Sequence, residues 1–194
     1  PLAGESKPES KMEITTAELT IAQKDAIHQR VQGRMRRWYG EEREKNGMAC
    51  LYWMHAGLVT LGQHGIECWP AAGTARFHIQ PDDGKMTHFS FEWEGDPNAE
   101  LRRQAALSGD QVSLPEMHCW IYLPSTEEVV DFSTGHLPTL AKAMGFEWKV
   151  TPPPPYIWAR VQSLYPRAIY IPKRDATKLA IATLYAGHQK GTKQ

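Results

Sequence analysis

Three residues of this sequence could together carry covalent chemistry: Cys50, His118 and Asp131. A cysteine attacks a carbonyl carbon as its thiolate, so a neighbouring group must lower its pKa. A histidine can accept the thiol proton and leave an ion pair. A carboxylate behind the histidine fixes its tautomer and stabilises the charged ring. These residue types predict acyl transfer through a thioester on Cys50.

A β-hairpin predicted over residues 117–133 decides whether His118 and Asp131 can meet. Directly opposed residues of an antiparallel pair share a face, and so do residues two apart on one strand. A two-residue loop is disfavoured because Pro124 cannot adopt the positive φ that tight hairpin turns need. A four-residue loop over 124–127 places His118 diagonal to Asp131 on one face, whereas a five-residue loop would separate them.

A helix predicted from about residue 48 to 61 supplies a second reason for Cys50 to ionise. Its apolar stripe consists of Leu51, Met54, Leu58 and Leu61. Gly62 or Gly65 would end it. Cys50 would then lie in the first turn, where the backbone amide dipoles favour negative charge.

The remaining pattern predicts an α+β domain, with helices first and antiparallel strands afterwards. Residues 1–13 have the composition of a flexible arm, and 14–194 would form one domain. A capping box at Thr15 and Glu18 would start a helix over 16–39. The other expected elements are strands from Ile66, a hairpin loop at 81–84, helices at 100–107 and 134–144, a stiff segment at Pro152–Pro155 and a last helix that Asp175 caps and that runs to about Ala186.

Three segments resemble the core signature of the transglutaminase-like superfamily, which has the papain-like cysteine protease fold. Residues 48–69 are similar to its helix that starts at a nucleophilic cysteine and steps into a strand. His118-Cys119-Trp120-Ile121 is similar to its His-x-Trp strand, and Val129-Val130-Asp131 to its Val-Asp strand. The ordered set covers about residues 46–135. The resemblance implies a papain-like core with N-terminal helices packed on an antiparallel sheet, and catalysis by Cys50, His118 and Asp131.

The sequence departs from the family pattern in ways that indicate a distant relative. Gly47 stands three residues before Cys50 rather than two, and Gln63-His64 lengthens the step into the strand. Asp131 is followed by Phe132-Ser133 rather than by Pro-Thr. The substrate class therefore stays open.

An oxyanion hole needs two donors, and the Cys50 backbone amide is the natural first one. Papain-like relatives use an upstream Gln as the second donor, and transglutaminases use an upstream Trp or Tyr. The candidates here are Trp38, Tyr39 and Asn46. Trp120, beside His118, is expected to line the substrate cleft. Cys68 and Cys119 are interpreted as packing residues, since cysteine is among the most buried residue types.

These features predict a cysteine-type hydrolase acting on a peptide, a protein or a small amide, because hydrolysis needs no second substrate site. Two alternatives stay open. One is an acyltransferase similar to transglutaminases or arylamine N-acetyltransferases, and the other is a catalytically idle peptide-binding module.

Composition limits the possible partners and compartments. Lys and Arg number 22, as do Asp and Glu, so zero net charge gives no reason to expect nucleic acid or a membrane surface as partner. No run approaches the roughly 18 apolar residues of a membrane span. Three cysteines without CxxC spacing favour a reducing compartment, and we expect a cytoplasmic protein.

No HExxH motif, paired cysteine ligands or nucleotide-binding motif is present, so no metal or cofactor is expected. The oligomeric state is not predicted.

Overall fold

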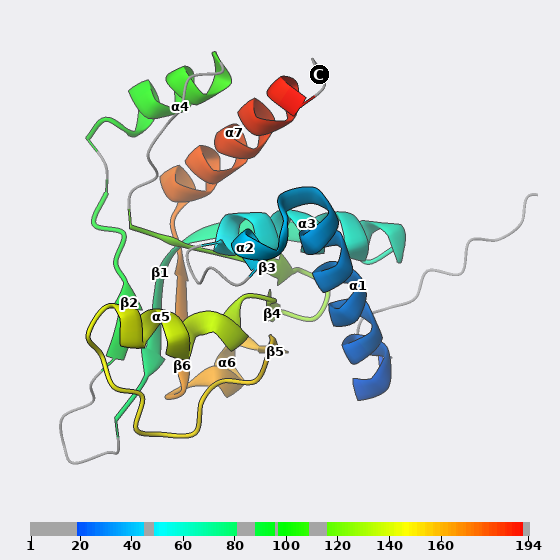
Figure 1. The fold of residues 1–194 in the computed structure, drawn as a ribbon, viewed down its shortest axis with the longest axis vertical. Helices are drawn as coiled ribbons and strands as arrows, with labels where there is room; N and C mark the ends of the chain where they lie inside the picture. The colour runs from blue at the N-terminus through cyan, green and yellow to red at the C-terminus, as the bar shows by residue number, and fades with distance from the viewer. Residues whose placement is uncertain (1–18, 45–48, 81–87, 96, 109–115, 192–194) are drawn as a thin grey trace, which may run out of the picture.

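The computed structural model describes residues 19–44, 49–80, 88–95, 97–108 and 116–191. They form an α+β fold in which helices surround one curled antiparallel sheet (Figure 1). The helices are α1 (Ile21–Tyr39), α2 (Glu41–Glu44), α3 (Cys50–Gln63), α4 (Ala99–Leu107), the 3-10 turn η2 (Thr134–His136), α5 (Leu137–Ala143), α6 (Val161–Leu164) and α7 (Arg174–Gly191). The strands are β1 (Trp69–His78), β2 (His88–Phe91), β3 (His118–Leu123), β4 (Glu128–Asp131), β5 (Ile157–Arg160) and β6 (Ala168–Pro172).

The first helix starts later than the sequence predicted, because a different threonine caps it. Thr20 accepts a hydrogen bond from the Gln23 backbone N–H at 3.3 Å, and the Gln23 side chain accepts from the Thr20 N–H at 2.8 Å. This is a reciprocal capping box with Gln at the third position, so α1 begins at Ile21 rather than near residue 16. The expected cap at Thr15 and Glu18 lies outside the described residues, as does the arm over 1–13.

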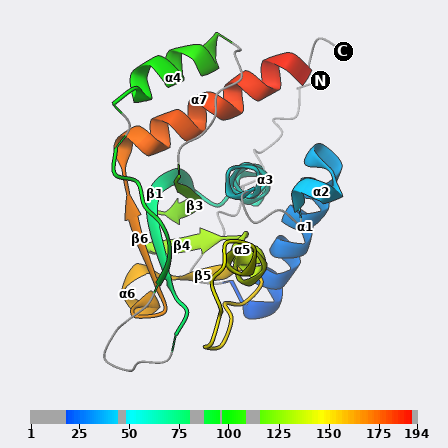
Figure 2. The ribbon, with the colours of Figure 1, turned by 60° about the vertical axis from the view of Figure 1, so that its left-hand side comes forward.

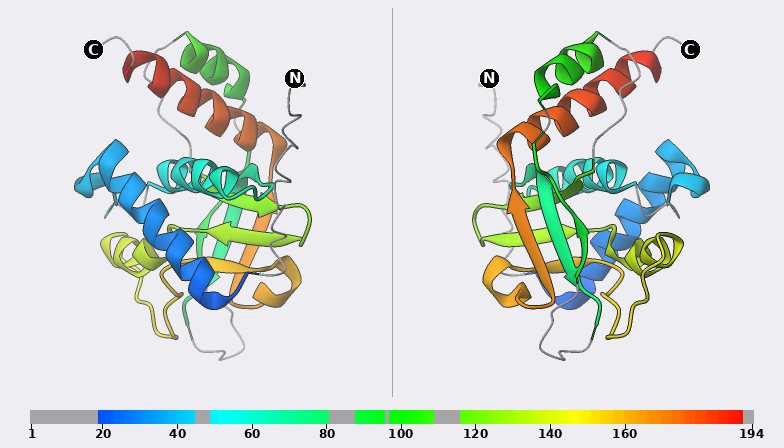
Figure 3. Two further views of the ribbon diagram at one scale, coloured as in Figure 1. Left: turned by 90° about the vertical axis from the view of Figure 1, so that its right-hand side faces the viewer. Right: turned by 90° about the vertical axis from the view of Figure 1, so that its left-hand side faces the viewer.

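Strand β1 is the centre of the sheet. It pairs antiparallel with β3 through residues 69–73, with β6 through 73–77 and with β2 through 75–78. β4 continues the sheet from β3, and β5 follows β4. As a result β3, β4 and β5 cross the direction of β1, β2 and β6 at a steep angle (Figure 3). This bend gives the sheet its curl.

Alternation along β3 divides the core into two layers. Cys119, Ile121 and Leu123 point into the layer that holds buried residues of α1 and α3. Trp120 points into the second layer, with aromatic residues of β1 and β2 and with the start of α5. Helix α3 lies between the sheet and α1 (Figure 2). Its N-terminal end is thereby held against the start of β3.

The C-terminal part contains elements that the sequence pattern did not predict. After Pro155 the chain forms β5, α6 and β6; β5 ends the sheet beside β4, and β6 pairs with β1. The last helix, α7, starts at Arg174, so Asp175 lies in its first turn instead of capping it as expected, and the helix packs on α4 and β1. The loop expected at 81–84 falls outside the described residues, although His78 pairs with His88 across it. No helix in the described ranges combines the length and apolarity that crossing a bilayer requires.

Candidate active site

Cys50 is the first residue of α3, as the helix pattern predicted. Ala49 is the N-cap residue, and its carbonyl accepts from the amides of Tyr52 and Trp53; among the described residues no side chain caps the first amides. An uncapped helix start leaves backbone N–H groups free to stabilise negative charge. The thiol is 6% exposed, so it lies just beneath the surface.

Close packing of α3 on the sheet sets the position of this thiol. A Cβ added at Gly57 would lie 2.6 Å from Cδ1 of Ile121 on β3 and 2.8 Å from the ring of Phe132 after β4. Only glycine allows the helix backbone to come this close. The contact holds α3 against the same hairpin that carries His118 and Asp131.

The hairpin has the register that allows His118 and Asp131 to meet. Leu123 pairs with Glu128, so the loop is the four-residue loop over 124–127 that the parity argument required. Glu127 in this loop takes a positive φ of 55°. His118 Nε2 and Asp131 Oδ2 are 2.7 Å apart, and both side chains are buried. The predicted hydrogen bond between them is therefore present.

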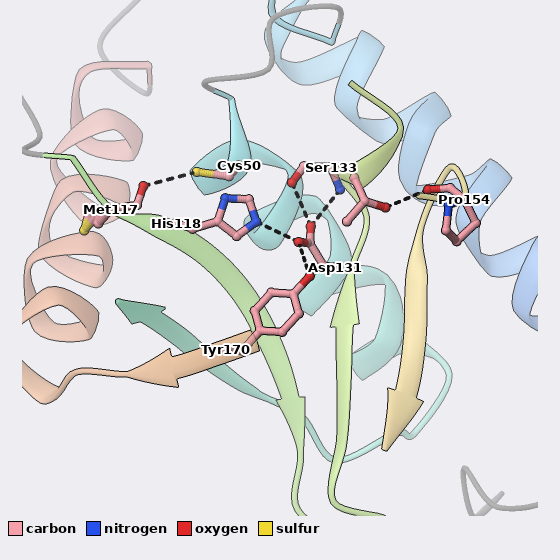
Figure 4. A network of polar contacts seen from close by, with 8 residues as sticks. Cys50, Met117, His118, Asp131, Ser133, Pro154 and Tyr170 are labelled. Carbon is pink, nitrogen blue, oxygen red and sulfur yellow. Dashed lines mark hydrogen bonds and ion pairs between the residues drawn. The ribbon is translucent and has the colours of Figure 1, made fainter. Parts of the chain in front are cut away.

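Asp131 accepts hydrogen bonds at both carboxylate oxygens (Figure 4). Oδ1 accepts from the Ser133 backbone N–H at 2.9 Å and from the Ser133 hydroxyl at 2.7 Å. Oδ2 accepts from the Tyr170 hydroxyl at 2.9 Å as well as from His118. Buried carboxylates are costly unless they are paired and hydrogen-bonded, and this one is both.

The bond to Asp131 fixes the tautomer of His118. Since the carboxylate accepts, Nε2 carries the proton of this hydrogen bond. Nδ1 is therefore the ring nitrogen that is not engaged by Asp131. Nδ1 is buried, has no hydrogen-bond partner within ordinary distance and faces Cys50 (Figure 4). The ring therefore stands between the thiol and the carboxylate.

The charges in this group favour a protonated histidine. Burial opposes the positive charge, but Asp131, with a further contribution from Cys50, raises the pKa of His118 to about 10. Burial likewise opposes the charge of Asp131, while His118 and the Ser133 donors hold the pKa of the carboxyl below its ordinary value. An aspartate–imidazolium pair is the consistent state at neutral pH.

The thiol of Cys50 has a depressed pKa. The first cause is a hydrogen bond from the Cys119 thiol, the second is the adjacent His118, and together they outweigh burial. The same contact and burial raise the pKa of Cys119 well above its usual range. These opposite directions favour ionisation of Cys50 before Cys119. A contact from Cys50 Sγ to the Met117 carbonyl, at 4.0 Å, is at the limit for a sulfur donor.

Aromatic rings enclose the imidazole of His118. The ring stacks on Phe91 at 4.8 Å between centroids and meets Phe77 edge-on at 5.6 Å. Trp120 and Tyr170 complete the enclosure at 6.4 and 6.2 Å. The apolar wall excludes water from the His118–Asp131 pair, which strengthens their electrostatic interaction.

Of the three candidates for a second oxyanion donor, two lie against α3 and one is not described by the structure. Trp38 and Tyr39 contact His55, and the Tyr39 ring also packs on Tyr52 at 4.6 Å. His55 and Tyr52 lie five and two residues beyond Cys50 on α3. Asn46 lies outside the described residues. A donor role for any of the three stays a prediction.

Trp120, the residue expected to line the substrate cleft, is buried in the second core layer. It lines a cavity of about 690 Å³ whose walls include Tyr170 but none of Cys50, His118 and Asp131.

No three His, Cys, Asp or Glu side chains in the described ranges are arranged to hold a metal ion.

Three residues of the site were not assigned to it from the sequence. Ser133 could have been found, because a side-chain oxygen of Asp commonly accepts from the amide two residues on. Tyr170 could not, since its place in the site depends on the pairing of β6 with β1, which is distant in the sequence. Cys119 was interpreted as a packing residue; it lies on the opposite face of β3 from His118, as expected, but it shares that core layer with Cys50 and lowers the pKa of its thiol.

Comparisons with known proteins leave the family of this chain open. No family model matches the sequence, and no curated protein matches it at a significant level. A solved crystal structure described as "genomics APC5867" shares 16% identity, with a TM-score of 0.47, over 86% of this chain and 74% of its own.

Proposed function

We propose that this protein is a cysteine-nucleophile acyl-transfer enzyme of the transglutaminase-like type, acting as a hydrolase on a peptide or amide bond. One observation carries the proposal: the His118 ring stands between the Cys50 thiol and the Asp131 carboxylate, with Nε2 hydrogen-bonded at 2.7 Å and Nδ1 facing the thiol. That order of groups is what a thiolate nucleophile and its general acid require.

The proposed reaction proceeds in two steps. The Cys50 thiolate attacks the carbonyl carbon, and the negative charge that develops on the oxygen is stabilised by the Cys50 amide at the start of α3. The C–S bond forms, the C–N bond breaks, and the proton on His118 Nδ1 goes to the leaving amine. Water then attacks the thioester and gives a proton back to His118, which releases the acid and restores the thiolate.

The alternative acceptor is an amine, which would make the enzyme an acyltransferase. Release of nitrophenol from a p-nitrophenyl ester, followed by analysis of the acyl product with and without added glycine ethyl ester, separates the two. A carboxylic acid as the only product indicates a hydrolase, whereas an amide that grows with amine concentration indicates a transferase. Cys50→Ser serves as the control that must abolish both products.

A catalytically idle binding module is the second candidate, and the depth of the site favours it. Cys50 is 6% exposed, and His118 and Asp131 are 0% and 1% exposed. A small electrophile decides between the candidates. Brief treatment with dilute iodoacetamide at pH 6, followed by peptide mass spectrometry, should modify Cys50 well ahead of the two other thiols, because burial raises the pKa of Cys68 to about 11.

His118→Gln is the matched test of the mechanism in that labelling experiment. The variant removes the proton carrier and the positive charge, so alkylation of Cys50 at pH 6 should fall at least tenfold. Equal labelling of Cys50 in both proteins, or labelling no faster than Cys68, would exclude the proposed chemistry.

A further inference from the structure

A second site lies on the face of the sheet that also carries His118. The cavity of about 690 Å³ described above has the size of a small-molecule pocket. It is separate from Cys50, and the inference drawn from it does not depend on the proposed function.

The walls of this cavity are rich in aromatic rings. Trp69, Trp120, Tyr122 and Tyr170 contribute them from β1, β3 and β6. Trp120 and Tyr170 pack edge-on at 5.1 Å and are buried, whereas Trp69 is 54% exposed. An exposed tryptophan next to a recessed aromatic floor provides a flat apolar surface on which another ring can stack.

The rim of the cavity is positively charged. Lys173, Arg174 and Lys178, from the end of β6 and the first turns of α7, line it, and all three are exposed. Among the described residues that line the cavity there is no Asp or Glu. Cations on one rim above an aromatic floor are complementary to a molecule with an aromatic body and one acidic group.

We infer that this cavity binds an aromatic carboxylate, with its ring against Trp69 and Trp120 and its carboxylate at Lys173 and Arg174. Such a ligand would also contact the ring of Tyr170, whose hydroxyl donates to Asp131. The second site therefore adjoins the His118–Asp131 pair through two of its lining side chains, Tyr170 and Trp120.

Titration calorimetry of the full chain with 2-naphthoate tests the inference, and 2-naphthamide is the neutral control of the same shape. Naphthoate should bind roughly tenfold more tightly than naphthamide at low ionic strength, because only the former can pair with the rim. The advantage should shrink as salt is added. Equal affinities, or no binding of naphthoate at millimolar concentration, would overturn the inference.

Charge variants test whether the cations of the rim bind the carboxylate. Lys173→Gln combined with Arg174→Gln should weaken naphthoate by roughly tenfold and leave naphthamide within twofold. Lys142→Gln combined with Lys149→Gln removes the same charge from exposed positions on and after α5, and should leave both affinities unchanged. Trp69→Ala should weaken both ligands. An unchanged naphthoate affinity in the rim variant would place the ligand elsewhere, and a wild-type dimer that Trp69→Ala dissociates would instead show that a second copy covers this cavity.

Discussion

The Tyr170 hydroxyl donates a hydrogen bond of 2.9 Å to Oδ2 of Asp131, the same oxygen that accepts from the buried histidine. Tyr170 comes from β6, which pairs with β1, whereas Asp131 ends β4 on the other side of β3. The bond thus spans the inside of the curled sheet (Figure 4). Burial and the adjacent carboxylate raise the pKa of Tyr170 well above its usual range, so the hydroxyl stays a donor.

Tyr170→Phe should therefore lower both stability and the reactivity of Cys50. Asp131 would keep its other donors but lose one bond to a buried charge, which costs about 1–3 kcal/mol of unfolding free energy. Denaturant unfolding measures this loss. Alkylation of Cys50 at pH 6 should slow by a few-fold, because the carboxylate supports the imidazolium less well.

Tyr156→Phe is the matched control for that experiment. Its hydroxyl also donates to a carboxylate, Asp25 Oδ1 at 2.7 Å, but at the exposed surface. Exposed bonds of this kind contribute little, so we expect less than about 1 kcal/mol and no change in Cys50 alkylation. If both variants behave alike, Tyr170 has only a packing role.

Asp131→Asn should raise the pH at which the Cys50 thiolate forms. Without the carboxylate, only Cys50 opposes the effect of burial on His118, and the pKa of its ring falls from about 10. A neutral imidazole stabilises the thiolate less, so the midpoint of the thiolate absorbance at 240 nm should move up by roughly one pH unit or more. An unchanged midpoint would show that His118 does not govern Cys50.

Acid unfolding gives an independent check on Asp131. Its pKa is lowered in the folded state, so its contribution to stability is complete above its unfolded value near 3.8 and is lost as pH falls through the folded value. The stability difference between wild type and Asp131→Asn should therefore be about 3 kcal/mol at pH 6 and should shrink towards pH 3. Asp25→Asn, at the exposed tyrosine bond, should show neither effect.

Cys119 is predicted to hold the Cys50 thiolate by its S–H group. Cys119→Ala removes the donor and should raise the 240 nm midpoint by roughly one pH unit. Cys119→Ser keeps a hydroxyl donor at the same place and should retain a low midpoint. Cys68→Ala, which removes a thiol outside this contact, should leave it unchanged. A low midpoint in Cys119→Ala would show that His118 alone is sufficient.

The local part of this arrangement could be read from the sequence. The stripe of apolar residues located α3, and its first turn placed Cys50. Parity along a hairpin, together with the restriction that Pro124 imposes on short loops, reduced the question to one loop length, and the four-residue loop of the structure brings His118 to Asp131. Both arguments depend on residues close together in the chain, where backbone geometry alone limits the choices.

The long-range part could not be predicted. Tyr170 reaches Asp131 because β6 pairs with the far end of β1, and the residues around 170 do not by themselves indicate which strand they pair with. Cys119 approaches Cys50 because of how deeply α3 packs on the sheet, which depends on the side chains of several elements at once. Similarly, Trp38 and Tyr39 lie at His55 because of the way α1 packs along α3.

Gly57→Ala tests whether that packing depth sets the geometry of the site. The added methyl group would clash with Ile121 and Phe132, at 2.6 and 2.8 Å, so either α3 or these two side chains must shift, and a shift of α3 is the outcome we expect. Overpacking of this kind costs about 1–3 kcal/mol, and the shift should also separate Cys50 from His118 and slow alkylation at pH 6. Thermal unfolding and the labelling assay measure the two effects.

Gly62→Ala is the control on the same helix. A Cβ at Gly62 meets no atom within 4 Å, and alanine favours a helix over glycine by about 1 kcal/mol, so this variant should be slightly more stable with normal alkylation. Opposite signs for the two substitutions would show that contact with the hairpin, rather than helix propensity, controls the position of Cys50. If Gly57→Ala instead matched Gly62→Ala, the close approach of α3 would not be what positions the thiol.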